Sequence, residues 1–254
     1  MSQKLEQLAR DEAFMARALA LAERGTGWTS PNPLVGAVIV KDGRIIGEGW
    51  HTACGQPHAE REALAACDED PAGSTLYVTL EPCCHWGKTP PCTDAILEAG
   101  IARVVVGALD PNPLVAGQGC AQLREAGTVV ETGVLEEGCR HLNEVFFHFI
   151  TTGRPLVVLK YAMTLDGKAA TRTGASRWIT GPEARERVHR DRHRFAAIMV
   201  GIGTALADDP ALTCRLEGGP WRQPLRIVVD SQGRLPLDAL LVRTAQEIPT
   251  LVAV

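Results

Sequence analysis

The chain has 254 residues, 45% hydrophobic and 22% charged, with a formal net charge of −4 at pH 7. This composition is typical of a globular protein and argues against disordered, collagenous and membrane-spanning classes. The small negative charge disfavours nucleic acid as a partner, because that binding depends on neutralising phosphates. No run approaches the ~18 apolar residues of a membrane span. The charged start of the chain lacks a signal peptide's apolar run, which predicts a cytoplasmic protein with no membrane partner.

The first half of the sequence alternates between helical and strand-like patterns. Residues 5–24 carry apolar side chains at helical spacing and stop at Gly25. Residues 35–40 and 45–49 flank a glycine-containing turn and predict a β-hairpin. The pattern then predicts helices at 58–66, 93–99 and 118–126 and strands at 75–80, 104–107 and 128–131. This alternation predicts a three-layer α/β domain.

A second, strand-rich unit is predicted after about residue 150, so that the domains are 1–150 and 151–254. Residues 155–162 are almost continuously apolar or β-branched and predict a strand. A helix is predicted at 182–194, and further strands are predicted at 196–201 and 225–230. The Arg- and His-rich stretch 185–194 has mixed charges, which is typical of a solvated helix face.

His58, Cys83 and Cys92 form a candidate zinc site. Imidazole and thiolate suit zinc, and a catalytic zinc typically has three protein ligands and one open position. A His-x-Glu motif followed by Pro-Cys and a later Cys is the signature of zinc nucleobase deaminases. Glu60 is therefore predicted to be the catalytic proton shuttle, facing the metal site without ligating it.

Two other interpretations remain open from the residues alone. A structural zinc site would close with four ligands, and Cys84 or His85 could supply the fourth. Such a site would belong to a non-catalytic, zinc-stabilised module, and a catalytic site could instead act on another base or nucleotide. The other cysteines have no paired spacing and are predicted to be packing residues: Cys54, Cys67, Cys120, Cys139 and Cys214.

Several longer motifs extend the pattern: PNPLVG, GEGWH, HAE, EPCCHWGKTPPC and DPNPLVAGQG, and, in the second half, LVVLKYAMTLDGKAATRTGASRWITG and GIGTALADDPALTCR. With them the chain closely resembles the bifunctional riboflavin-biosynthesis deaminase/reductase family. The resemblance implies an α/β protein in which a cytidine-deaminase-like α/β/α domain precedes a dihydrofolate-reductase-like domain. It implies zinc-dependent removal of a ring amino group from a phosphoribosylated diaminopyrimidine, then NADPH-dependent reduction of its ribosyl group to ribityl. A homo-oligomer is also implied.

The resemblance also carries residue roles. His58, Cys83 and Cys92 match the family's zinc ligands and Glu60 its proton shuttle. In the first domain, the positions that match the family's substrate-holding residues are Asn32, His51, His85 and Lys88. In the second domain, the substrate positions are Ser176, Arg192, Leu212 and Arg215, and the NADPH positions are Ala162, Trp178, Thr204, Asp208 and Ser231.

The second domain raises expectations about its catalytic residues and about its extent. Lys160 and Asp208 are candidates for assisting ring opening or proton transfer. Without the resemblance, Arg192 and Arg215 are more often surface charges, Asn32 a turn residue and Lys88 a solvent-exposed side chain. The family's reductase domain normally continues beyond the point that corresponds to Val254, so the domain appears truncated and its reductase activity is expected to be doubtful.

Overall fold

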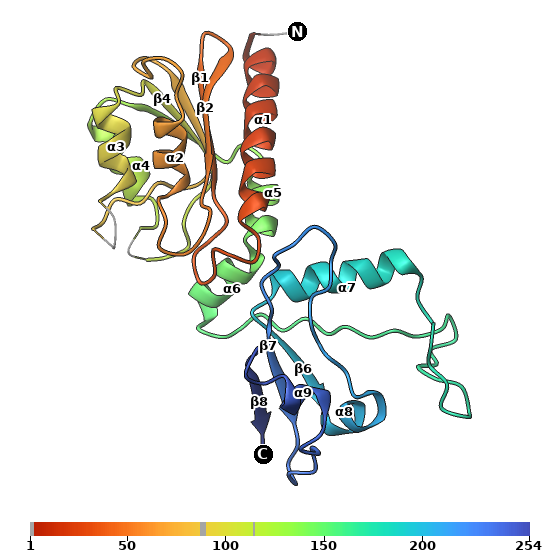
Figure 1. The fold of residues 1–254 in the computed structure, drawn as a ribbon. Coiled ribbons are helices and arrows are strands. Elements are labelled where there is room, and N and C mark those ends of the chain that lie inside the picture. Colours follow the sequence, from red (N-terminus) through yellow and green to blue (C-terminus); the bar gives the residue numbers. More distant parts are fainter. Residues whose placement is uncertain (1–2, 87–89, 114) are drawn as a thin grey trace. The chain divides into compact units, whose positions relative to one another are not determined.

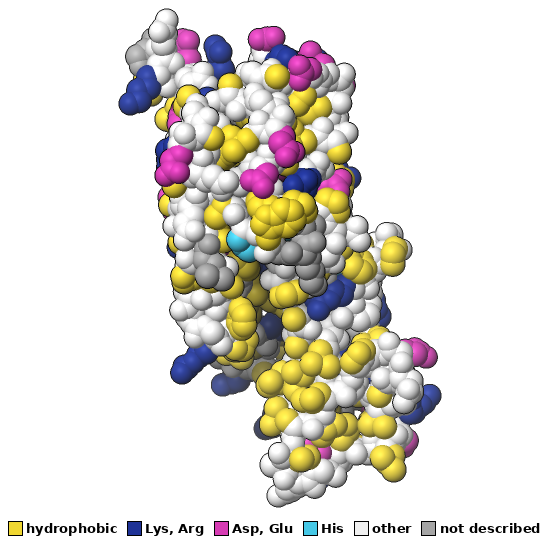
Figure 2. All heavy atoms as spheres, turned by 90° about the vertical axis from the view of Figure 1, so that its left-hand side faces the viewer, with side chains coloured by type: hydrophobic (Ala, Val, Ile, Leu, Met, Phe, Trp, Pro, Cys, Tyr) yellow, Lys and Arg dark blue, Asp and Glu magenta, His cyan; other side chains and the backbone are white. Residues whose placement is uncertain are grey.

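The computed structural model describes residues 3–86, 90–113 and 115–254, which form two compact units, 1–156 and 157–254 (Figure 1). No helix among these residues is both long enough and apolar enough to cross a membrane. On the face drawn in Figure 2, acidic and basic side chains are interspersed. The elements of the first unit are α1 (Gln3–Ala22), η1 (Glu23–Gly25), β1 (Gly36–Lys41), β2 (Arg44–Trp50), α2 (Ala59–Ala65), β3 (Thr75–Leu80), α3 (Cys92–Glu98), β4 (Arg103–Ala108), α4 (Gln118–Glu125), β5 (Val129–Thr132), α5 (Glu136–Leu142) and α6 (Glu144–Thr152).

The first unit is a five-stranded sheet with helices on both faces. The strand order is β2-β1-β3-β4-β5, with β1 antiparallel to β2 and β3 and the remaining pairs parallel. Helices α1 and α5 cover one face, and α2, α3 and α4 cover the other (Figure 1). The parallel pairing of β3 and β4 brings the carboxyl ends of both strands to one edge of the sheet.

The core follows from the two-residue period of the strands. In β4, Val104 and Val106 pack in the cluster under α2, α3 and α4, whereas Val105 packs in the cluster under α1 and α5. Each of these three valines is fully buried. The sheet is therefore apolar on both faces, as a central parallel strand requires.

A buried ion pair joins α1 to the sheet. Asp11 is 2% exposed; its carboxylate accepts hydrogen bonds from the Arg103 guanidinium at 2.7 and 2.9 Å and from the Tyr77 hydroxyl at 2.7 Å. Burial alone raises the pKa of Asp11, but the hydrogen bonds from Arg103 and Tyr77 outweigh it and hold the pKa below its usual value. The same guanidinium also pairs with Glu131 at 2.9 Å.

The second unit has a three-stranded parallel sheet of order β6-β7-β8. Its core includes Ile202, Leu212, Val228 and Leu241. Its elements are α7 (Pro182–Arg194), β6 (Ala197–Gly201), α8 (Ile202–Asp208), β7 (Leu225–Val229), α9 (Leu240–Arg243) and β8 (Thr250–Ala253).

Arg226 on β7 is fully buried in this second unit. Its guanidinium donates to the carbonyl oxygens of Ala211, Leu241 and Ile248 and to the Thr244 hydroxyl, at 2.7 to 3.2 Å. All four of these partners are neutral, so carbonyl and hydroxyl dipoles stabilise the buried cation, while its Nε has no hydrogen-bond partner among the described residues.

The α/β class and the three-layer first domain are confirmed, as are the predicted hairpin, the alternating helices and strands that follow it, and the helix at 182–194. The strand predicted at 155–162 is wrong: the segment has no regular secondary structure, and Val157 and Leu159 are 83% and 82% exposed. An apolar, β-branched run forms a strand only beside another strand, and no strand of the described chain pairs with this one. Residues 136–152, left unassigned by the sequence, form α5 and α6.

Candidate active site

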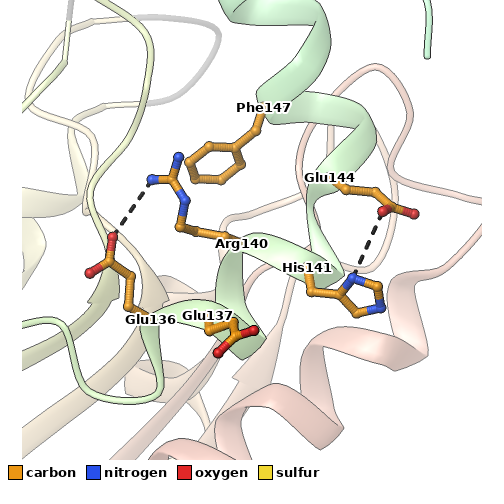
Figure 3. Close-up of a pocket in the computed structure, with 6 residues that line it drawn as sticks. All are labelled: Glu136, Glu137, Arg140, His141, Glu144 and Phe147. Carbon is orange, nitrogen blue, oxygen red and sulfur yellow. Dashed lines mark ion pairs between the residues drawn. The ribbon is translucent and has the colours of Figure 1, made fainter.

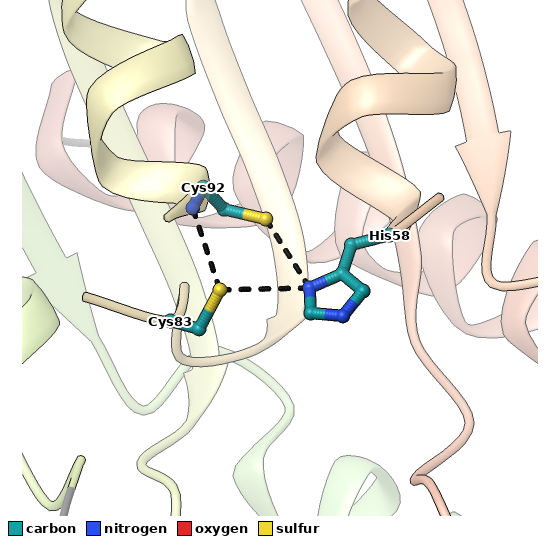
Figure 4. Close-up of side chains that lie close together, drawn as sticks. All are labelled: His58, Cys83 and Cys92. Atoms are coloured by element: carbon teal, nitrogen blue, oxygen red, sulfur yellow. Dashed lines mark hydrogen bonds between the residues drawn. The ribbon is translucent and has the colours of Figure 1, made fainter. Parts of the chain in front are cut away.

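Three donor atoms from three separate segments converge beside the carboxyl end of β3 (Figure 4). His58 is the N-cap of α2, Cys92 is the first residue of α3, and Cys83 lies in the loop after β3. His58 Nδ1 lies 3.5 Å from Cys83 Sγ and 3.3 Å from Cys92 Sγ, and the donor atoms of the three residues all lie within 4.8 Å of one another. One nitrogen and two sulfurs at these separations fit the donor set that zinc prefers.

The adjacent Cys83 and Cys92 thiols shift each other's pKa in opposite directions. Hydrogen bonding by Cys92 and His58 lowers the pKa of Cys83 to about 4, despite the burial that opposes it. The adjacent thiolate and burial raise the pKa of Cys92. Without a metal, the thiolate form is therefore favoured at Cys83 and disfavoured at Cys92. The site is therefore built to hold negative charge, which a divalent cation neutralises.

Glu60 is 3% exposed in the first turn of α2, two residues after His58. Burial and the neighbouring Cys83 thiolate raise the pKa of its carboxyl group from 4.5 to about 7. A carboxyl group with a pKa near neutrality can both accept and release a proton at working pH. Glu60 does not belong to the donor group, which suits a proton carrier rather than a ligand.

A cavity of about 340 Å³ opens over these residues. Its lining includes His58, Glu60 and Cys83 together with three predicted substrate residues, Asn32, His51 and His85. The lining also includes polar residues that sequence reasoning missed, among them Asp110 and Asn112. Both follow β4, whose carboxyl end meets that of β3, and burial raises the pKa of Asp110.

Hydrogen bonds set the tautomer of His51, which is 3% exposed. Its Nδ1 lies 3.0 Å from the Pro57 carbonyl oxygen, which can only accept, so Nδ1 carries the proton. Burial lowers the pKa of His51 and keeps the ring neutral, so Nε2 accepts from the Asn32 amide nitrogen at 3.1 Å. His51 thus fixes which way the Asn32 amide faces, and the amide oxygen of Asn32 stays available to a ligand.

Glu81 anchors the loops around the site. Its buried carboxylate accepts hydrogen bonds from the backbone N–H groups of Asp110, Gly117 and Cys120, at 3.2, 2.8 and 3.1 Å. Gly119 is needed beside it, because a Cβ there would lie 2.1 Å from the Pro82 carbonyl oxygen. The segment before Cys83 and the segment after β4 are therefore held together by one side chain.

The remaining predictions for the first domain concern Lys88, a possible fourth metal ligand and the other cysteines. Lys88 lies outside the described residues, so its placement stays a prediction. Among the described residues, neither Cys84 nor His85 joins the donor group, so the geometry does not support a closed four-ligand site. Cys120, Cys139 and Cys214 are buried as packing residues, whereas Cys54 is exposed and lines the cavity.

A second, shallow hollow lies on the surface of α5 and α6 (Figure 3). Arg140 pairs with Glu136 at 3.6 Å and covers the Phe147 ring, and His141 lies 3.8 Å from Glu144. None of the predicted site residues lines this hollow. Charged side chains of both signs on an exposed surface of this kind are typical of a solvated helix face.

In the second unit, a group of cationic side chains forms around α7. Arg192 donates to the Thr213 carbonyl oxygen at 3.1 Å, and the Arg215 guanidinium donates to the Thr213 hydroxyl at 2.7 Å. Burial lowers the pKa of His189, and the charges of the two arginines lower it further. His189 Nδ1 accepts a hydrogen bond from the backbone N–H of Arg215 at 3.1 Å. No ion pair to an acidic group is found for Arg192 or Arg215 within the described chain.

The other predicted residues of this unit do not form one enclosed site in the described structure. Leu212 is 6% exposed and packs in the core, which leaves only its backbone for a ligand. Ala162 is half-buried, and Trp178 is 73% exposed with Arg185 over its ring. Also exposed are Ser176, Thr204, Asp208 and Ser231.

Comparisons with known proteins agree with this geometry. Residues 8–108 match the family model described as the cytidine and deoxycytidylate deaminase zinc-binding region, and residues 155–254 match the model of the RibD C-terminal domain. Fold and site together thus define a zinc-binding domain of the cytidine-deaminase type joined to a RibD C-terminal domain.

Relatives that align with almost the whole chain assign it to one protein family. The chain is 57% identical over 243 residues to the riboflavin biosynthesis protein RibD of Actinobacillus pleuropneumoniae, covering 96% of this chain and 64% of the relative. It is 52% identical to RibD of Aquifex aeolicus, covering 95% of this chain and 67% of the relative. The chain belongs to the RibD family and spans about two thirds of the length of these relatives.

A solved structure gives the same answer for the fold. The diaminohydroxyphosphoribosylaminopyrimidine deaminase/5-amino-6-(5-phosphoribosylamino)uracil reductase of Thermotoga maritima superposes with a TM-score of 0.90 at 48% identity. The match covers 97% of this chain and 70% of that one.

Proposed function

We propose that the first unit catalyses the zinc-dependent hydrolytic deamination of 2,5-diamino-6-(5-phosphoribosylamino)pyrimidin-4-one, an early step of riboflavin biosynthesis. We propose also that the second unit contributes to NADPH-dependent reduction of the deaminated product's ribosyl group. The observation that carries the first proposal is the pairing of a three-donor group with a separate, buried carboxyl group in one cavity.

The donor chemistry fits zinc, with His58, Cys83 and Cys92 as the three ligands. When bound, zinc supplies Lewis-acid activation of a water molecule near neutral pH. Glu60 would accept one proton from the attacking water and pass it to the ring nitrogen, and would then carry the second proton, from the oxygen now bonded to the ring carbon, to the departing amino group, which leaves as ammonia. Its buried position excludes solvent that would compete for the proton.

The rest of the cavity supports a flat, polar ring as substrate. The neutral His51 holds the Asn32 amide in one orientation, so that its oxygen can accept from a ring N–H or amino group. His85, Asp110 and Asn112 add polar groups on the same lining. Lys88 stays the proposed phosphate partner on the strength of the family resemblance.

The reductase proposal draws support from charge and topology. Arg192 and Arg215 lie around one peptide unit at Thr213 and suit a substrate phosphate, because guanidinium forks match phosphate oxygens. Thr204 and Ser231 follow the carboxyl ends of the parallel strands β6 and β7, the edge where such sheets bind nucleotides. NADPH would supply the hydride there. A homo-oligomer completes the proposal, on the resemblance alone.

The deaminase proposal is tested by measuring zinc content and ammonia release from the diaminopyrimidine for the wild-type chain and for Glu60→Gln. One zinc in each protein, with ammonia from the wild type only, supports it. Release of ammonia from cytidine, deoxycytidylate or guanine instead would assign another substrate. Zinc without ammonia from any substrate would overturn the catalytic proposal. NADPH oxidation with the deaminated product tests the second unit separately.

A further inference from the structure

Arg61 joins the two parts of the donor group. It lies in the first turn of α2, one residue after Glu60, and is half-buried. Its Nη2 donates to the carbonyl oxygen of Pro91 at 3.0 Å and to that of Pro90 at 3.3 Å. The helix that carries His58 and Glu60 is therefore hydrogen-bonded to the segment that leads directly into Cys92.

The two cysteines already form one unit without this bond. The backbone N–H of Cys92 donates to the Cys83 carbonyl oxygen at 3.0 Å, and the N–H of Thr93 donates to the same oxygen at 3.2 Å. His58 belongs to a different helix, so the shape of the donor triangle depends on how this two-cysteine unit lies against α2. We propose that Arg61 is a positioning residue that fixes this arrangement and thereby raises the affinity of the site for zinc.

The chemistry of the contact suits that role. Pro90 and Pro91 have no N–H group, so their carbonyl oxygens are the backbone atoms through which this dipeptide can be held by a hydrogen bond. Arginine stays charged at every working pH and offers a rigid planar fork, whereas lysine offers one flexible point charge. The Arg61 Nε is buried without a hydrogen-bond partner among the described residues, so the two carbonyls account for the direction of the guanidinium.

A ligand set that is already in place loses less conformational freedom when the metal binds. Removing a residue that supports metal ligands typically lowers metal affinity by about 10- to 100-fold. Arg61→Met keeps most of the aliphatic stem and removes both hydrogen bonds, so we expect a loss in that range. Arg61→Lys keeps a charge near the carbonyls, and we expect it to fall between the wild type and Arg61→Met.

The test uses the full chain, stripped of metal and kept reduced. Zinc affinity is measured by competition with a chromophoric chelator, and Co²⁺ is titrated in parallel because its visible spectrum reports the ligand geometry. Arg124→Met is the matched control, because Arg124 also donates to a backbone carbonyl oxygen, that of Val130 at 3.1 Å, but on β5 rather than at the cysteines. Ammonia release is followed as zinc is raised.

Weaker zinc binding by Arg61→Met than by Arg124→Met, an altered Co²⁺ spectrum and ammonia release that recovers with added zinc would support the inference. Wild-type zinc affinity and an unchanged Co²⁺ spectrum in both Arg61 variants would overturn it. The inference rests on the proposed zinc site. A wild-type chain that binds neither metal would therefore overturn both proposals, whereas a zinc-binding wild type with unaffected variants would overturn only this one.

Discussion

Glu60→Gln should make the metal-free protein more stable relative to the wild type as pH rises, and should at the same time abolish most of its ammonia release. Burial raises the pKa of Glu60 from 4.5 to about 7 in the folded protein, whereas the unfolded chain ionises near the usual value. Between these two pH values the folded state holds a proton that the unfolded state has lost, so the wild type loses stability as pH rises across the interval and stays at the lower level above it. The shift corresponds to about 3 kcal/mol.

Glutamine is neutral at every pH and does not undergo this change. The free energy of unfolding of metal-free Glu60→Gln, minus that of the metal-free wild type, should therefore rise by about 3 kcal/mol between pH 4.5 and pH 8. Any constant effect of the new amide cancels in this comparison. Ammonia release by the zinc-loaded variant should fall by at least about 100-fold, since the proton carrier is gone.

The stability difference can be measured by urea unfolding in the presence of a chelator and a thiol reductant, at several pH values. Hydrogen exchange measured on peptides from α2 and α3 reports the stability of the first unit separately from that of the second. A difference that stays constant with pH, or that grows in favour of the wild type, would refute the assignment of a raised pKa to a buried carboxyl group. A variant with wild-type ammonia release would refute the proton-carrier role.

Three more predictions follow from single side chains. Asp11→Asn should lower the free energy of unfolding of the first unit by about 3 kcal/mol near pH 7, as for other broken buried pairs. This difference from the wild type should shrink as the pH falls below 4, because the pKa of Asp11 is lowered in the folded protein. Urea unfolding at pH 7 and pH 3 measures both effects. Glu81→Gln should lower the free energy of unfolding of the first unit by about 2 kcal/mol, because an amide NH₂ group would face backbone N–H donors. Hydrogen exchange should then be faster in the segment that follows β4. His51→Leu should lower kcat/KM by about tenfold through KM, as its lost hydrogen bond frees the Asn32 amide, whereas His51→Gln, which can still donate to Pro57, should recover part of the loss.

The clustering of His58, Cys83 and Cys92 and the position of Glu60 beside them could be predicted because they depend on residue type and local spacing. His58 and Glu60 share the start of one helix, and Cys92 opens another, so short-range sequence already carries their arrangement. Asp110 and Asn112 could not be found in this way. They reach the cavity because β4 lies parallel to β3, and the polar turn after that buried strand, together with the DPNPLVAGQG motif that contains both residues, was the available signal.

The errors and omissions have similar physical causes. The segment 155–162 has the composition of a strand, but strand formation needs a neighbouring strand that composition does not supply. The contact from Arg61 to two proline carbonyls leaves no pattern in the sequence, because it depends on a loop that returns to α2. Leu212 matches a substrate position by the family resemblance, and that role stays a prediction; its side chain packs in the core, which the sequence did not indicate.

The buried arginines of the two units respond differently to acid. Arg103 depends on the Asp11 carboxylate, so protonation of that group removes its principal ionic partner. Arg226 is held by three carbonyl oxygens and one hydroxyl, which keep the same charge and hydrogen-bonding capacity across the accessible pH range. Acidification therefore loosens the attachment of α1 to its sheet in the first unit and leaves the contacts of the Arg226 guanidinium in the second unit intact.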